Sequence, residues 1–401
     1  MVGVSGATIA SVGGSGATRT VVVNTGAGSG TLGLDLVDNN TIIDYVSNPL
    51  GGSGPTNGNF TGQTFTVDKT VPVVSSIVRA STSPTKATSV SFTVTFSEPV
   101  YSVDAADFNL NMVGVSGATI ASVSGSGATR TVVVNTGAGS GTLGLDLVDN
   151  NTIIDYLNNP LGGSGPANGN FTGESYTVDK TVPVVSLIVR ASTSPTKATS
   201  VSFTVTFSEP VYGVDAADFN LNMVGVSGAT IASVSGSGAT RTVVVNTGSG
   251  SGTLGLDLVD NNTIIDYVSN PLGGSGPTNG NFTGQTYTVD KTMPVVSSIV
   301  RVNPNPTALA SVSFTVTFSE PVYGVDAADF NLNMVGVSGA TITSVSGGGA
   351  TRTVVVNTGT GSGTLGLDLV DNNTIIDYVS NPLGGSGPGN GNFTGEIYAV
   401  R

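Results

Sequence analysis

Hydrophobic and small polar residues alternate strictly along three closely similar stretches, Val90–Phe108, Val201–Phe219 and Val312–Phe330. In the first stretch, valine or phenylalanine occupies every second position from Val90 to Phe96, with serine or threonine between them. A period of two in β-branched and aromatic residues predicts a strand with one buried face. The proline three residues further on ends the strand, because its nitrogen cannot donate a hydrogen bond to a sheet. Each stretch is therefore predicted to be a half-buried strand that runs into a loop rich in aspartate.

The chain is built from internal repeats. The motif MVGVSGATI starts at Met1, Met112, Met223 and Met334, at a constant interval of 111 residues. A period of this length is too long for a solenoid unit and matches one independent domain. The predicted domains are a partial repeat at residues 1–66 and complete repeats at residues 67–177, 178–288 and 289–401.

The first complete repeat contains seven short segments with strand character, separated by Gly, Ser and Pro turn signals, and no helical periodicity. The predicted strands are Val73–Arg79, Ser89–Phe96, Phe108–Met112, Thr119–Ser124, Thr129–Asn135, Thr142–Leu147 and Ser175–Val178. Seven strands in about 110 residues indicate an all-β fold of tandem immunoglobulin-like (Ig-like) sandwiches, joined head to tail in a rod. In the next repeat, the core is predicted to rest on Phe203, Val205, Phe207, Leu254, Leu256 and Leu258.

Two features of this organisation are unusual. The loop before the last strand, Val148–Gly173, is far longer than the roughly 12–15 residues common in compact domains, so it is expected to be functional or locally ordered. Residues 1–66 lack the first three strands, including the alternating one. We therefore expect them not to fold alone, so that either a preceding part of the natural chain or another chain supplies the missing strands.

Composition excludes several classes of function. The 401 residues include no Cys, His or Trp, which removes disulfides, thiolate metal sites and the usual general base. With 13 Lys+Arg against 26 Asp+Glu, the net charge is -13, which argues against nucleic acid as a partner. No apolar run approaches the roughly 18–20 residues of a membrane span.

The acidic residues concentrate at one end of each predicted sandwich, where the linker, the loop after the alternating strand and the long loop meet. The candidate metal ligands are Asp68, Glu98, Asp104, Asp107, Asp149, Asp155, Asp179, Glu209, Asp215, Asp218, Asp260, Asp266, Asp290, Glu320, Asp326, Asp329, Asp371 and Asp377. Calcium prefers hard oxygen ligands, six to eight at a time, so one interpretation is a Ca²⁺ ion that stiffens each junction. The other is a set of solvated loops that keep the protein soluble, since no D-x-D-x-D-G spacing is present.

Paired carboxylates also occur in glycosidases, but catalysis needs a cleft with aromatic walls. The same acids repeat in every copy and the chain has no Trp. The sequence therefore predicts that the protein is not an enzyme.

Three motifs carry a resemblance that covers essentially the whole chain: VSFTVTFSEPV, the D-x-x-x-N-P-L of Asp155–Leu161, and the VDKTVP junction. Together they resemble the bacterial Ig-like repeats of large secreted and cell-surface proteins. In that family, an Ala-Gly pair usually precedes the Asn of the second motif, and this chain lacks it. The resemblance implies the Ig-like fold and a location outside the cell or on its surface.

Two functions are consistent with the repeats, the acidic loops and the resemblance, and both stay open. The first is structural: repeats of an extracellular filament, sheath or adhesin stalk, whose partners are copies of itself or neighbouring repeats. The second is a binding module that recognises glycans or another cell through the long loops.

Overall fold

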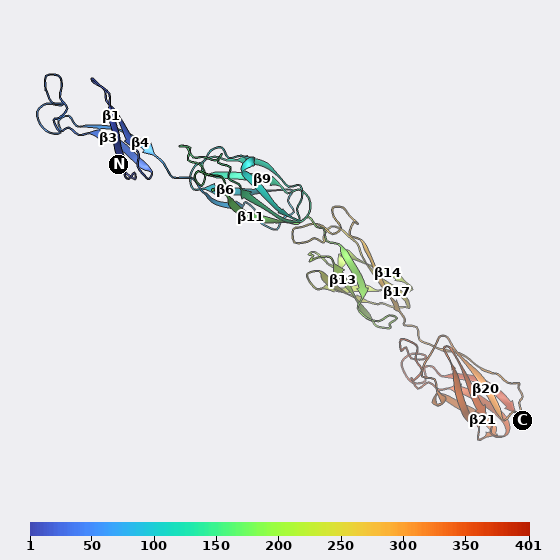
Figure 1. Ribbon diagram of the computed structural model, residues 1–401. Helices are drawn as coiled ribbons and strands as arrows, with labels where there is room; N and C mark the ends of the chain where they lie inside the picture. Colours follow the sequence, from blue (N-terminus) through green and yellow to red (C-terminus); the bar gives the residue numbers. More distant parts are fainter. The chain divides into compact units, whose positions relative to one another are not determined.

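The computed structural model describes residues 1–401, and apart from three single-turn 3₁₀ helices its regular elements are all strands. No helix has the length and hydrophobicity that a membrane crossing requires. The chain divides into two compact units, Met1–Thr181 and Val182–Arg401. Figure 1 shows the strands of both units.

The first unit contains the partial repeat and one complete repeat. The strands of the partial repeat are β1 (Thr8–Gly13), β2 (Thr20–Asn24), β3 (Gly30–Leu36) and β4 (Phe60–Val67). The complete repeat consists of β5 (Val74–Arg79), β6 (Ser89–Phe96), η1 (Ala105–Asp107), β7 (Phe108–Val113), β8 (Thr119–Ser124), β9 (Thr129–Asn135), β10 (Gly141–Leu147) and β11 (Phe171–Val178).

The second unit contains two complete repeats. The elements of the first are β12 (Val185–Arg190), β13 (Ser200–Phe207), η2 (Ala216–Asp218), β14 (Phe219–Val224), β15 (Thr230–Ser235), β16 (Thr240–Asn246), β17 (Gly252–Leu258) and β18 (Phe282–Val289). Those of the second are β19 (Val296–Arg301), β20 (Ser311–Phe318), η3 (Ala327–Asp329), β21 (Phe330–Ser338), β22 (Thr341–Gly348), β23 (Thr351–Asn357), β24 (Thr360–Leu369) and β25 (Phe393–Val400).

Each complete repeat is a sandwich of two antiparallel sheets. In the first, a four-stranded sheet has the order β5-β6-β9-β8 and a three-stranded sheet has the order β11-β10-β7. The other two complete repeats have the same orders, β12-β13-β16-β15 with β14-β17-β18 and β19-β20-β23-β22 with β21-β24-β25. A four-stranded and a three-stranded sheet with this connectivity form the constant-type Ig fold, so the predicted fold class is confirmed.

Burial follows the alternation in the sequence. Along β6, every second residue is buried and the residues between them are half-buried or exposed. Phe92 packs edge-on against Tyr176 of the other sheet, with ring centroids 5.2 Å apart at an interplanar angle of 76°. The hydroxyl of Tyr176 donates to the carbonyl of Ser91 at 2.9 Å, so its polar end is satisfied inside the core. The six core residues predicted for the repeat at residues 178–288, which we call the third repeat of the chain, are all buried, which confirms that prediction.

The last strand of the repeat begins earlier than predicted. The sequence predicted a start at Ser175, whereas β11 starts at Phe171 and shortens the long loop. A bulge between Gly144 and Asp146 allows the pairing of β10 with β11 to continue, so that Phe171 lies opposite Leu147. Bulges depend on pairing with a partner strand, which local sequence patterns do not reveal.

Candidate metal centre

Three carboxylates converge where a linker meets the following sandwich. In the first unit these are Asp68 of the linker, Glu98 after β6, and Asp155 of the long loop between β10 and β11. Their oxygens all lie within 4.8 Å of one another. Asp290, Glu320 and Asp377 form the same arrangement in the second unit. We call these two sets the junction triads.

The equivalent residues of the middle linker are divided between the two units. Asp179 belongs to the first unit, whereas Glu209 and Asp266 belong to the second.

The aspartate of the long loop is held by its own turn. Asp155 is 3% exposed. Its Oδ1 accepts hydrogen bonds from the main-chain nitrogens of Leu157 and Asn159, both at 2.8 Å. Its Oδ2 accepts from the side-chain amide of Asn159 at 2.7 Å. The spacing of Asp and Asn in the D-x-x-x-N-P-L motif therefore builds a rigid turn that fixes one member of the triad.

The other two members of the first triad, Asp68 and Glu98, have pKa values that are shifted in opposite directions. In Asp68, hydrogen bonds from the main chain of Thr70 and the hydroxyl of Ser29 lower the pKa of the carboxyl. In Glu98, burial raises the pKa, and the charges of Asp68 and Asp155 raise it further. Burial likewise raises the pKa of Glu320, followed by the charges of Asp290 and Asp377. In both triads, the glutamate is therefore a carboxylate on which burial and the two neighbouring charges act in the same direction.

One oxygen of the second triad has no hydrogen-bond partner. Glu320 Oε1 is shielded from solvent and receives no hydrogen bond. The ion pairs Arg79–Glu174 and Arg301–Glu396 involve no member of the two junction triads. Buried polar atoms in native proteins are nearly always satisfied, and a cation is one of the groups that can satisfy a carboxylate oxygen.

The linker that carries Asp290 is held by the repeats on both of its sides. On the preceding repeat, the main-chain nitrogen of Lys291 donates to Ser251 Oγ at 2.9 Å. On the following repeat, Asn381 Nδ2 donates to the carbonyl of Asp290 at 3.2 Å. Gly384 also donates to the carbonyl of Pro294, at 2.9 Å. The linker is thus an ordered connection bonded at both ends.

The lysines near the second triad donate their hydrogen bonds to other groups. The ammonium group of Lys291 donates to Thr247 Oγ1 at 2.8 Å and to the carbonyl of Gly248. Lys197 Nζ donates to the carbonyl of Ser380 at 2.6 Å. Both cations are therefore bound to neutral acceptors.

The remaining predicted ligands have structural roles in their own loops. Asp104 and Asp107 form the capping box of η1: each side chain accepts a hydrogen bond from the main chain of the turn. Burial raises the pKa of Asp107, against the hydrogen bonds from Asp104 and Thr152. Asp149 accepts from the main-chain nitrogens of Asn151 and Gly169, both at 3.0 Å, and closes the long loop. The equivalent residues of the later repeats are Asp215, Asp218, Asp260, Asp326, Asp329 and Asp371, with the same capping boxes at η2 and η3.

Sequence reasoning missed two groups of residues that position the junctions. The first comprises Ser251 and Asn381, which bind the linker from opposite sides; the fixed spacing of Asn381 from Asp377 was the available signal. The second is a buried arginine, Arg130, whose Nη2 donates to the carbonyl of Val100 at 2.6 Å and so holds the loop after β6. Its place in the alternation, on the same face of the strand as Val132 and Val134, was the available signal.

No family model matches the chain, and no curated protein matches it. Among solved structures, FdeC, an adhesin of Escherichia coli, is similar with 16% identity and a TM-score of 0.36; the match covers 81% of this chain and 96% of that one. Invasin, a bacterial integrin-binding protein, has 12% identity and a TM-score of 0.35, covering 91% and 79%. The S-layer protein rSbsC has 14% identity and a TM-score of 0.17, covering 83% and 54%. The proteins with which this chain shares similarity thus include a bacterial adhesin, an invasin and a surface-layer protein.

Proposed function

We propose that this chain is a non-enzymatic structural segment of a bacterial extracellular protein, in which calcium fixes the linkers between Ig-like repeats. The observation that carries the proposal is the convergence of three carboxylates on a linker that is hydrogen-bonded to both of its neighbours. A stalk or filament needs such connections, because an unrestrained linker would let adjacent domains move independently.

Electrostatics favours a cation at this position. Like charges 4–5 Å apart repel by roughly 1–4 kcal/mol per pair, depending on the local dielectric. Carboxylate and carbonyl oxygens are the ligands that calcium accepts, whereas transition metals favour the imidazole and thiolate groups that this chain lacks. In the second unit, Asp290, Glu320 and Asp377 would hold the ion, and Glu320 Oε1 would gain the partner that it lacks.

Calcium is expected to bind the intact chain saturably, and Glu320→Gln is expected to remove the site in the second unit. Glu320 is the preferred position, because its Oε1 makes no hydrogen bond whose loss would disturb the loops. A ligand that binds only the folded state stabilises it by about 2.7 kcal/mol at a hundredfold excess over its dissociation constant. Isothermal titration calorimetry gives the stoichiometry, and scanning calorimetry in EGTA and in calcium gives the stabilisation.

Glu396→Gln is the matched control. It removes the same charge from β25, where Glu396 pairs with Arg301 and belongs to no triad. This variant should bind calcium like the parent chain. Absence of saturable heat in the parent chain would refute calcium binding and leave the acids as solvated loops.

The response to calcium should also depend on pH. Because burial raises the pKa of Glu320 above its ordinary value of 4.5, the metal-free folded state binds a proton more readily than the unfolded chain. The contribution of this group to metal-free stability is therefore greatest below pH 4.5 and is lost as the pH rises through the raised pKa. Calcium requires the ionised carboxylate, so its stabilising effect should grow over that same rise in pH.

Melting temperatures measured from about pH 4 to pH 7, in EGTA and in calcium, test the direction in which the stability changes with pH. In Glu320→Gln the pH dependence contributed by the Glu320 carboxyl should disappear. A calcium shift of equal size at every pH would contradict the assignment of Glu320 as a ligand.

A second candidate function is a binding module that uses the long loops. It is favoured by one tyrosine in each loop that projects into solvent: Tyr156, Tyr267 and Tyr378 are 81%, 71% and 70% exposed. Saturable binding of a glycan that is abolished when all three become alanine would favour this function over the structural one.

A further inference from the structure

Each long loop contains an asparagine followed by a glycine. These pairs are Asn168-Gly169 in the first complete repeat, Asn279-Gly280 in the third repeat and Asn390-Gly391 in the last repeat. Asparagine is among the residues that limit the chemical durability of proteins. The main-chain nitrogen that follows it can attack the side-chain amide, and glycine hinders this attack least because it has no side chain. The surroundings of each pair therefore decide whether it reacts.

Packing explains why glycine occupies the second position. Gly169 is buried against Leu161, which is 0% exposed. A Cβ atom at position 169 would lie 2.5 Å from Leu161 Cγ and 3.2 Å from the carboxyl carbon of Asp149. The fold therefore requires glycine here, and it cannot slow the reaction by placing a bulkier residue after the asparagine.

The attacking nitrogen is bound to a buried carboxylate. The main-chain nitrogen of Gly169 donates to Asp149 Oδ2 at 3.0 Å. The main chain of Asp149 binds the residues on either side of this pair: its carbonyl accepts from the nitrogen of Ala167 at 3.2 Å, and its nitrogen donates to Asn170 Oδ1 at 2.7 Å. We call these three hydrogen bonds the Asp149 clamp. To attack, the Gly169 nitrogen would have to leave the carboxylate and lose its proton, and the neighbouring negative charge disfavours that loss.

The amide that would be attacked is also bound. Asn168 Nδ2 donates to the carbonyl of Ser164 at 3.1 Å. The amide packs over Gly165, where a Cβ atom would lie 3.1 Å from Asn168 Nδ2. Asn168 itself is exposed, so water reaches it. Protection of this pair thus depends on hydrogen bonds and not on burial of the amide.

Both hydrogen bonds recur in the later repeats. In the third repeat, Gly280 donates to Asp260 Oδ2 at 3.1 Å. Asn279 Nδ2 donates there to the carbonyl of Ser275 at 3.0 Å. In the last repeat the same two bonds measure 3.2 Å and 2.8 Å, from Gly391 to Asp371 and from Asn390 to Ser386. The clamp is therefore a regular feature of the long loop.

We propose that Asn168, Asn279 and Asn390 are latent deamidation sites, which the aspartate clamps keep from reacting while the long loops are closed. In the reaction, the Gly169 nitrogen bonds to Asn168 Cγ, the bond from Cγ to the amide nitrogen breaks, and ammonia leaves with the proton of the Gly169 nitrogen. Water then opens the cyclic succinimide to aspartate or isoaspartate. The reaction needs no oxidant, cofactor or second protein.

The product cannot restore the closed turn. A carboxylate at position 168 has no N–H group to donate to the carbonyl of Ser164, and two acceptors in contact repel each other. Each reaction therefore opens a long loop permanently. The proposal goes beyond the proposed function, because it concerns the chemical lifetime of the loops and not their ligands.

The experiment incubates the full chain in EGTA at neutral pH and room temperature, and tandem mass spectrometry measures deamidation at each of the three sites. In the folded chain, each site should react roughly 10- to 100-fold more slowly than in the same chain unfolded in guanidinium chloride, because a hydrogen bond to a charged group must open first. Asp149→Ala should remove most of this protection at Asn168, while Asn279 and Asn390 in the same molecule stay slow. Hydrogen exchange in β9 and β10 shows whether the altered repeat remains folded.

Asp146→Ala is the matched control. Asp146 Oδ1 accepts from the main-chain nitrogen of Gly173 at 3.2 Å, at the end of the same loop and outside the clamp. This variant loses the same charge and one main-chain hydrogen bond, and Asn168 should stay slow in it. If Asp149→Ala unfolds its repeat, Asp149→Asn replaces it. A neutral acceptor holds an N–H group less strongly than a carboxylate does, so Asn168 should still react faster than Asn279.

Three results would overturn the proposal. The first is an equal rate of deamidation in the folded and the unfolded parent chain. The second is an unchanged rate at Asn168 in the folded Asp149 variant. The third is equal acceleration by Asp146→Ala, which would show that general loosening of the loop controls the reaction. None of these variants alters a junction triad, and EGTA removes calcium, so the outcome is independent of calcium binding.

Discussion

Replacing Phe203 with alanine is expected to unfold the third repeat while the other complete repeats stay folded. Phe203 is 0% exposed and packs edge-on against Tyr287 at 5.2 Å, so its removal leaves a cavity between the two sheets. Truncation of a buried phenylalanine costs about 3–5 kcal/mol, a large share of the 5–15 kcal/mol that stabilises a typical domain. Scanning calorimetry of the full chain should show one transition moved to lower temperature. Hydrogen exchange should assign that transition to β12–β18.

Tyr267→Ala is the matched control for this prediction. It also truncates an aromatic residue of the third repeat, but Tyr267 is 71% exposed. Its effect should stay within about 0.5 kcal/mol, as is usual for surface positions. If Phe203→Ala melted like this control, the contribution of Phe203 to the core would be refuted.

Replacing Asp149 with asparagine is expected to loosen the long loop of the first complete repeat, residues 67–177. Asp149 is 4% exposed, and its two carboxylate oxygens each accept a main-chain N–H, from Asn151 and from Gly169. Asparagine keeps one acceptor and places an NH₂ group against the other N–H, so a buried donor loses its partner. Such a loss costs about 1–3 kcal/mol. For a domain near 100 residues, each kcal/mol lowers the melting temperature by roughly 4–8 °C.

The chain offers its own control for this change. Glu174→Gln introduces the residue that the next repeat carries naturally as Gln285, and the Glu174 side chain is 47% exposed. Its effect on melting should be small. Asp149→Asn should keep the calcium response of the junction triad, because Asp149 belongs to the loop and not to the triad. An Asp149→Asn variant that melts like the parent chain would contradict the role of Asp149 in closing the loop.

Local pattern in the sequence was enough to predict the strands and the fold class. The alternation from Val90 to Phe96 corresponds to β6, whose bounds were predicted correctly, because burial on one face of a strand has a period of two residues. The interval of 111 residues indicated one sandwich per repeat. Composition alone also argued against nucleic-acid binding, since that argument depends on charge and not on shape.

Other features depend on which segments meet in three dimensions. The sequence placed six acids of the first complete repeat at one end of the sandwich. The structure brings three of them together and shows that Asp104, Asp107 and Asp149 are bound in their own loops. Spatial convergence makes that distinction, because Asp155 of the triad also accepts main-chain hydrogen bonds, and residue type does not reveal which acids meet. The early start of β11 likewise depends on a bulge in a partner strand.

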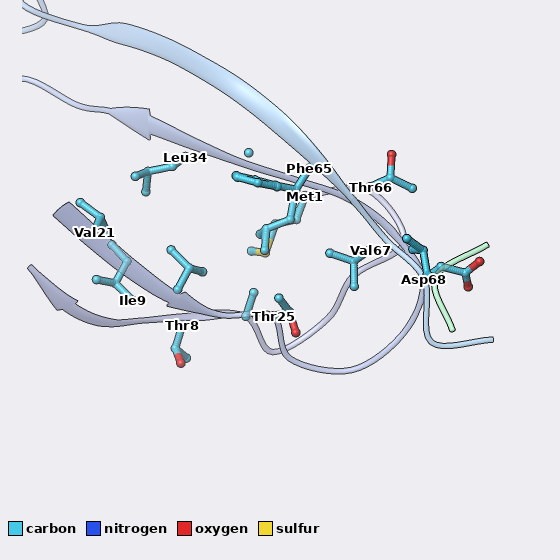
Figure 2. Close-up of a pocket in the computed structure, with 15 residues that line it drawn as sticks. Met1, Thr8, Ile9, Val21, Thr25, Leu34, Phe65, Thr66, Val67 and Asp68 are labelled. Atoms are coloured by element: carbon cyan, nitrogen blue, oxygen red, sulfur yellow. The ribbon is translucent and has the colours of Figure 1, made fainter. Parts of the chain in front are cut away.

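The partial repeat also separates what the sequence predicts from what only the tertiary structure shows. From the sequence alone, residues 1–66 lack the alternating strand, and this predicts an incomplete sandwich. Only the tertiary structure shows that Leu34 and Phe65 (Figure 2) are exposed in residues 1–66 and that Arg19 is bonded within its own turn. The sequence by itself thus determined the strands and the repeat, because these follow from local periodicity. The junction triads were decided by tertiary packing, because each is made by segments far apart in the chain.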